Sequence, residues 1–178
     1  IKFDTATSVL SMPKERRWIL LAEYADKTMI RNKIAFELGK LSDLSWAPLS
    51  EFVELFLNSE YQGTYNLVEK IEHSPNRINP ERSAYLLEID QLERLDTTAS
   101  YFLSNFHLFH IKQPDVTQES NELANIKNLI LNFEDALIYQ RFSDDAEGYK
   151  SFINLDSFVD WFLINEITKS IDAGDFYS

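Results

Sequence analysis

Residues 51–71 read "EFVELFLNSEYQGTYNLVEKI" and contain the clearest structural signal in the chain. In the first part of this stretch, Phe52, Glu54 and Phe56 alternate with Val53, Leu55 and Leu57, and residues 64–71 form a second run of strand-forming side chains. Residues 58–63, between the two runs, include Asn, Ser and Gly, which are typical of turns. The stretch therefore predicts a β-hairpin.

Upstream of the hairpin, "RWILLAEY" at residues 17–24 has the length and apolar content of a short strand. Asp26 or Thr28 can then cap a helix that continues to about Leu38, and Gly39 is placed to end it. Apolar residues recur at helical spacing through this segment, at Ile30, Ile34, Leu38 and Leu41. The first part of the chain is therefore predicted to run strand, helix, hairpin.

Downstream of the hairpin, "AYLLEID" (84–90) and "LFHIKQ" (108–113) are expected to be short strands. Apolar periodicity then predicts a helix over about 117–139 and a last helix from an Asp156 cap to about residue 169. Apolar side chains cover nearly every side of that last helix, so we expect it to lie in a core. This order predicts the α+β class.

Composition narrows the possible functions. The chain has 178 residues, a net charge of −12, a pI of about 4.6 and no cysteine. Such acidity disfavours nucleic acid as a partner, and the missing thiols exclude disulfides and thiolate chemistry. No apolar stretch is long enough to predict a membrane span. The oligomeric state is not indicated.

Asp172 is the main candidate for chemistry, because it follows the last helix in "SIDAGD". Gly174 lets the backbone turn tightly there, and a carboxylate held in such a loop could accept a proton or bind a metal ion. The alternative is that Asp172 only solvates a loop. The order of elements is that of a protein kinase, although the motifs G-x-G-x-x-G, V-A-I-K, H-R-D and D-F-G are all absent.

Four blocks of sequence, in order, resemble the CotH kinase family of atypical, secretory-kinase-like proteins. They are "SMPKERRWILLAEYADKTMIRNKIAFEL", the hairpin stretch, "IKQPD" and "INLDSFVDWFLINEITKSIDAG". The resemblance covers nearly all of residues 1–178, as an incomplete domain. It implies a protein-kinase-like fold, with a small antiparallel sheet lobe at about 1–72 and a helical lobe at about 117–178. It also implies ATP and Mg²⁺ as cofactors and phosphate transfer to Ser or Thr.

The resemblance also implies roles for single residues. Asp172 would be the catalytic-loop acid. Lys2 would approach the nucleotide phosphates, Arg31 and Asn32 match the family's "RN" pair, and Glu69 would lie beside the adenine where the chain crosses between lobes. No metal ligand is assigned.

Structural alternatives stay open for these positions. Arg31 could pair with a glutamate on the helix surface, Glu69 could be a solvated edge residue, and Lys2 could be disordered near a chain end. Lys112 in "IKQPD" is expected to be structural. His107 and His110 are three residues apart, so in a strand they would face opposite ways and would not share a metal.

Two functions follow as hypotheses. The first is a CotH-like kinase that phosphorylates a Ser/Thr-containing surface or coat protein, at an extracellular, cell-surface or spore-coat location. The family carries a glycine-rich segment before the Lys2 block and a Trp-Asp-x-Asp segment after the Asp172 block. Neither lies within these 178 residues, so we expect this chain alone not to be an efficient kinase. The second hypothesis is a non-catalytic structural or cell-surface binding module with the same fold.

Overall fold

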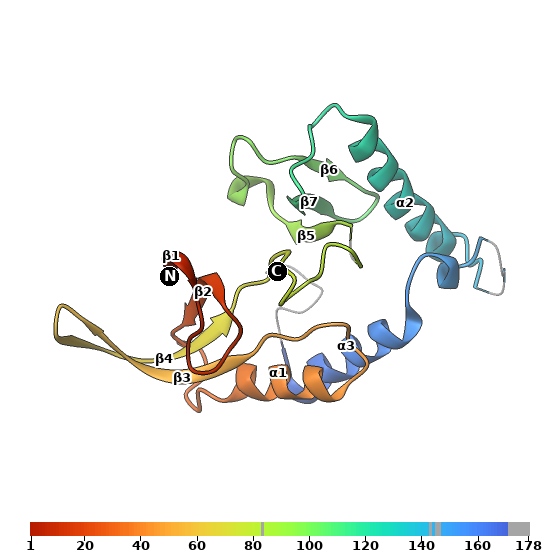
Figure 1. Cartoon of the computed structure of the whole chain (residues 1–178). Coiled ribbons are helices and arrows are strands. Elements are labelled where there is room, and N and C mark those ends of the chain that lie inside the picture. The colour runs from red at the N-terminus through yellow and green to blue at the C-terminus, as the bar shows by residue number, and fades with distance from the viewer. Residues whose placement is uncertain (83, 143, 145–146, 171–178) are drawn as a thin grey trace. The chain divides into compact units, whose positions relative to one another are not determined.

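The computed structural model describes residues 1–82, 84–142, 144 and 147–170 (Figure 1). These residues form two antiparallel sheets and three α-helices, which confirms the predicted α+β class. The chain divides into two compact units. The first contains Ile1–Asn79 with Val159–Ser170, and the second contains Pro80–Phe158. Asp172 lies outside the described residues.

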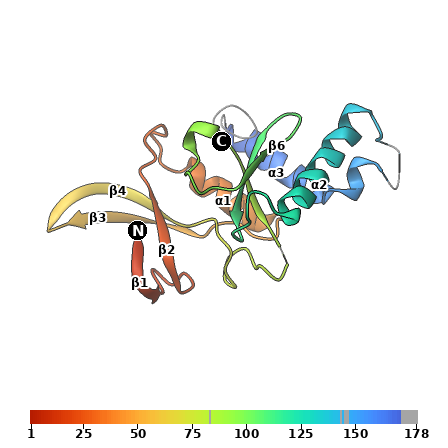
Figure 2. The same cartoon turned by 90° about the horizontal axis from the view of Figure 1, so that it is seen from above.

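The first unit is built on a four-stranded antiparallel sheet with the strand order β1-β2-β4-β3. Helix α1 follows β2 and precedes the β3–β4 hairpin, so the predicted order of strand, helix and hairpin is confirmed. The tip of the hairpin projects as a long arm in both views (Figures 1 and 2). The bounds are β1 (Lys2–Thr7), β2 (Glu15–Leu21), α1 (Arg31–Leu41), β3 (Ser50–Leu57) and β4 (Glu60–Glu69).

The turn of this hairpin is tighter than the predicted 58–63 segment. It consists of Asn58 and Ser59, whose positive φ angles of 51° and 71° suit a two-residue hairpin turn. Gly63 instead lies inside β4, with φ 115°, next to a shift in register that leaves Gln62 without a direct partner. The glycine therefore serves a β-bulge and not the turn.

Helix α1 continues past Gly39 to Leu41, so the prediction that Gly39 ends the helix is wrong. A Cβ atom at Gly39 would lie 2.9 Å from the Cβ of Ala47, closer than carbon atoms can pack. Glycine is thus required here by the close approach of the segment after the helix. A glycine that permits close packing looks the same in sequence as one that ends a helix.

One side of the first sheet carries the core of this unit. Trp18 from β2 and Leu67 from β4 are both almost completely buried, together with Met12. Partly buried apolar residues surround them: Phe3, Val9, Leu20, Leu49 and Val53. This core holds β1, β2 and β4 together, and so positions the residues at the ends of these strands.

Helix α3 (Leu155–Thr168) begins in the second unit and continues in the first. Its apolar side chains are substantially exposed, with Trp161 45% and Ile167 64% accessible. The prediction that this helix is buried on all sides is therefore wrong for the described residues. The described residues leave much of the apolar surface of α3 accessible to solvent. One contact is a hydrogen bond from the backbone N–H of Asp43 to the Asp160 carboxylate. No helix among the residues described here combines the length and apolarity needed to cross a membrane.

The second unit combines a three-stranded antiparallel sheet, of order β5-β7-β6, with helix α2. Ile111 of β7 and Phe102 of β6 face α2, where they pack against Leu123 and Ile126. The short strand β6 was not predicted. The bounds are β5 (Leu86–Asp90), η1 (Leu92–Arg94), β6 (Tyr101–Leu103), β7 (Leu108–Gln113), α2 (Asn121–Ile138) and η2 (Tyr149–Ser151).

Candidate functional site

A cavity of about 320 Å³ lies in the first unit, where β1 and β2 run side by side. It is lined by three cationic side chains, two carboxylates and a histidine, namely Lys2, Arg16, Arg17, Glu15, Glu72 and His73. The cations come from one edge of a sheet in a protein whose net charge is −12. We call this feature the basic cavity.

The basic cavity brings two positive charges together by sheet pairing. Lys2 of β1 is the cross-strand partner of Arg17 of β2, so both side chains lie on the same face of the sheet. Like charges in that position repel each other unless a negative group lies between or beside them. Glu72 supplies one such group, with its carboxylate 2.6 Å from the Arg17 guanidinium. A bound anion could supply another.

A buried ion network lies behind the wall of the basic cavity. Arg77, whose side chain is fully buried, donates to a Glu72 carboxylate oxygen and, over 2.7 Å, to the backbone carbonyl of Arg17. Its guanidinium also lies over the Trp18 ring, 5.3 Å from the ring centroid. Arg77 therefore fixes Glu72, which in turn holds Arg17 at the cavity.

Glu69 belongs to this network and not to the surface. Its side chain is 1% exposed, so the alternative that it is a solvated edge residue is wrong. One carboxylate oxygen accepts the backbone N–H of Leu49 at 2.9 Å, and the other lies 3.8 Å from Nε of Arg77. Burial raises the pKa of Glu69, although the Leu49 hydrogen bond and the Arg77 charge act in the opposite direction.

The "RN" pair begins helix α1. Asp26 accepts the backbone N–H of Arg31 at 2.9 Å and the hydroxyl of Thr28 at 2.7 Å. The Thr28 hydroxyl bond, followed by the Arg31 backbone bond, lowers the pKa of Asp26. Asn32 donates to Glu23, which also accepts from Asn66 of β4, a side chain with no exposed surface. The pair thus anchors the start of α1, and Asn32 ties it to the sheet.

The structure unites some of the predicted residues and separates others. Lys2 lines the basic cavity, and Glu69 reaches the same region through Arg77 and Glu72. Arg31 begins α1 and does not line that cavity. Lys112 belongs to the second unit, where its amine lies 2.7 Å from Glu88. The structural role expected for Lys112 stays a prediction.

Sequence reasoning missed Arg16, Arg17 and Arg77. The adjacent "RR" at the start of an apolar strand was an available signal, because consecutive charged residues at a strand end place a charge on each face. Arg77 gave no such signal, since it lies in the loop "HSPNRINPE" and is buried only through tertiary contacts.

A family model described as "CotH kinase protein" matches residues 1–177. No curated protein and no solved structure matches the chain.

Proposed function

The chain belongs to the CotH kinase protein family, and we propose that it forms part of a protein kinase that uses ATP and Mg²⁺. In this proposal the acceptor is a Ser or Thr hydroxyl of a surface or coat protein. The protein would act at the cell surface, in the spore coat or in the secreted space. These finer points of substrate, cofactor and location extend what family membership alone indicates.

The observation that carries the proposal is the basic cavity. Phosphoryl transfer depends chiefly on positioning and on neutralising phosphate charge. Lys2, Arg16 and Arg17 offer that charge at the sheet edge of the unit whose strand, helix and hairpin follow kinase order. The carboxylates there are already engaged, since Glu72 is held by two arginines and Glu15 accepts from Ser74. The cavity therefore suits a polyphosphate.

Each side chain has a separate task in this proposal. Lys2 and Arg16 are exposed and would contact phosphate oxygens, whereas Arg17 is held in place by Glu72. Asp172 would orient the acceptor hydroxyl and accept its proton, as the family resemblance implies. When bound, ATP supplies the phosphoryl group, and Mg²⁺ neutralises charge as it develops.

Calorimetric titration of the full protein with ATP and Mg²⁺ tests the binding step. Lys2→Gln and Arg16→Gln should each weaken ATP binding by about tenfold, the effect of losing one charge-assisted phosphate contact. Lys150→Gln removes the same charge from an exposed position in the second unit and should leave binding unchanged. Absence of ATP binding by the unaltered protein would defeat the proposal.

Transfer of phosphate from ATP to Ser- and Thr-containing peptides tests the chemical step. Asp172→Ala should abolish transfer while ATP binding persists, because its task concerns the acceptor hydroxyl. Full transfer activity in that variant would remove Asp172 from the mechanism. ATP binding by the unaltered protein without any transfer would favour the non-catalytic binding module.

A further inference from the structure

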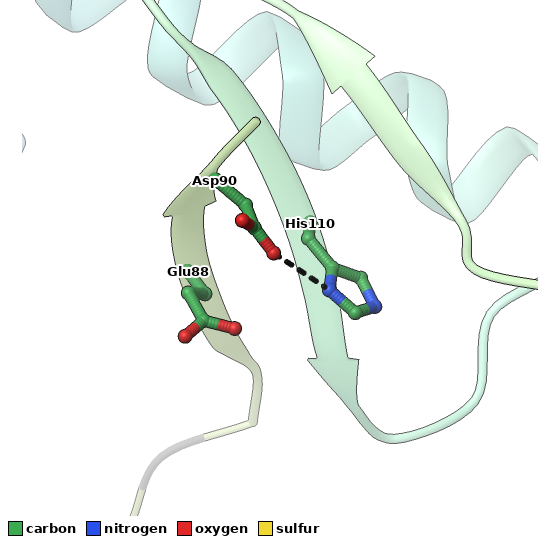
Figure 3. A group of neighbouring side chains, drawn as sticks. All are labelled: Glu88, Asp90 and His110. Atoms are coloured by element: carbon green, nitrogen blue, oxygen red, sulfur yellow. Dashed lines mark ion pairs between the residues drawn. The ribbon is translucent and has the colours of Figure 1, made fainter. Parts of the chain in front are cut away.

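Three potential metal ligands meet on the sheet of the second unit, away from the basic cavity. Glu88 and Asp90 are two residues apart on β5, so their side chains lie on the same face. His110 of β7 is the direct cross-strand partner of Glu88 and shares that face. Figure 3 shows the three side chains extending to one side of the two strands. Their nearest ligand atoms all lie within 4.8 Å of one another.

This face of the sheet is the one that the apolar core does not use. Leu87, Phe109 and Ile111 point to the opposite face, where they pack in the cluster that includes α2. The alternation of the two strands therefore places polar, chemically active side chains together on the other face. No local pattern of residues indicates this cluster, because it depends on the register between β5 and β7.

The histidine carries the strongest sign of a missing partner. His110 Nδ1 has almost no accessible surface and makes no hydrogen bond, and the side chain as a whole is 16% exposed. Oδ2 of Asp90, itself 12% exposed, lies 3.8 Å from that nitrogen. A gap of that size is too long for a hydrogen bond, but it fits two ligands that each lie about 2.0–2.2 Å from one ion.

We propose that Glu88, Asp90 and His110 bind a divalent transition-metal ion and so fasten β5 to β7. Two carboxylate oxygens and an imidazole nitrogen match Zn²⁺ or Mn²⁺, and three protein ligands leave a further position for water. Small side-chain rotations suffice to bring the ligand atoms to the roughly 3–4 Å separations found around such an ion. The site is independent of the proposed kinase function.

The surroundings of the cluster give a metal ion access to it and contain one cation that competes for Glu88. His110 also lines a cavity of about 330 Å³ that is bordered by Asp96 and Asp115, whose charges attract cations. Lys112 lies 2.7 Å from Glu88 and currently neutralises it. An ion that binds Glu88 must displace this ammonium group. Removing the Lys112 charge should therefore strengthen metal binding.

Equilibrium dialysis of the full protein against Zn²⁺ and, separately, Mn²⁺ tests the proposal. We expect one ion per chain that depends on the cluster, and a metal-dependent rise in melting temperature, since an ion that binds only the folded state stabilises it. His110→Gln and Glu88→Gln should each weaken this binding by at least about tenfold. Glu88 is largely exposed, so Glu88→Gln remains informative even if His110→Gln folds poorly.

Two further variants make the test specific. His107→Gln alters the neighbouring histidine outside the cluster and should leave metal binding unchanged. Lys112→Gln should tighten binding severalfold, a gain that a nonspecific ion would not show. Equal metal uptake by the unaltered protein, His110→Gln and Glu88→Gln would overturn the proposal, as would no uptake at all. Asp172→Ala should bind the ion normally, which separates this result from a failure of the kinase proposal.

Discussion

Arg77 organises the first unit because it satisfies several groups that would otherwise be buried alone. Its guanidinium joins Glu72, Glu69 and the carbonyl of Arg17 while it lies over Trp18. A buried charge is tolerated when it is paired. Arg77 hydrogen-bonds Glu72 and the Arg17 carbonyl, whereas its Nε faces Glu69 at 3.8 Å without a hydrogen bond. Stability of the first unit and the position of Arg17 at the basic cavity therefore depend on the same side chain.

Arg77→Met should lower the free energy of unfolding by about 3–5 kcal/mol, because it leaves buried Glu69 without a nearby cation and Glu72 with Arg17 alone. Urea unfolding measures this loss. Arg82→Met, at an exposed position, should change stability by less than about 0.5 kcal/mol and serves as the control. A loss at Arg77 no larger than that of the control would show that the buried network is not a stabilising feature.

Glu69→Gln tests the raised pKa of Glu69. The folded protein holds the Glu69 proton more tightly than the unfolded chain does. At pH values above 4.5, the ordinary pKa of a glutamate, Glu69 is therefore protonated more often in the folded state than in the unfolded state. The contribution of Glu69 to the stability of the unaltered protein should therefore fall as pH rises from about 4.5 through the raised pKa of Glu69. Glutamine does not titrate, and its amide oxygen can still accept the Leu49 N–H.

Urea unfolding of both proteins across this pH range measures the difference. Glu69→Gln should gain stability relative to the unaltered protein as pH rises, and the gain should level off above the folded-state pKa. A difference that is constant with pH, or that changes in the opposite direction, would contradict the burial argument.

At the scale of secondary-structure elements, local pattern predicted type better than boundaries. The hairpin was predicted because alternation and turn residues are local signals, and both exist in residues 51–71. The bulge at Gly63 and the interior position of Gly39 were not predicted, because each depends on how a neighbouring segment of the chain packs or pairs. The same limit explains Glu69, since Asn66, Leu67, Val68 and Glu69 are all buried and β4 therefore does not alternate at this end.

Gly39→Ala should destabilise the protein by about 1–3 kcal/mol, as overpacking does. Alanine favours a helix by up to about 1 kcal/mol over glycine, but the new Cβ would lie 2.9 Å from that of Ala47. Thermal unfolding measures the net effect. Adding Ala47→Gly removes the opposing carbon, so the double variant should recover part of the loss. Stabilisation by Gly39→Ala alone would show that the loop moves aside freely.

Helix α2 begins at a side-chain cap, where the Ser120 hydroxyl accepts the backbone N–H of Leu123 at 3.1 Å. Ser120→Ala should therefore lower the free energy of unfolding by about 1 kcal/mol. Ser120→Asp keeps an accepting oxygen at the positive end of the helix and should retain stability. Urea unfolding of the two variants measures the difference. Equal losses would indicate that the serine acts through packing and not as a cap.

At the scale of the whole molecule, the candidate sites were only partly accessible from sequence. Lys2 was named from family resemblance, and the structure places it among cations from another strand that no local motif connects to it. The cluster of Glu88, Asp90 and His110 was not predicted. His107 was compared with His110 along one segment, whereas the cluster forms between two paired strands. Asp172 lies outside the described residues, so its role stays a prediction.

The net charge of −12 makes a prediction for the molecule as a whole. With 29 acidic and 17 basic residues, carboxylates at neutral pH repel one another over the surface, and such repulsion destabilises a compact state. Raising NaCl from about 0.05 M to about 0.5 M shortens the screening distance from over 10 Å to under 5 Å. The melting temperature should then rise by roughly 2–4 °C, which corresponds to about 1 kcal/mol for a chain of this size.

The Arg77 network is buried and little screened, so Arg77→Met should show the same salt-dependent rise from a lower starting point. A melting temperature that falls with salt would mean that attractive surface ion pairs outweigh the net repulsion.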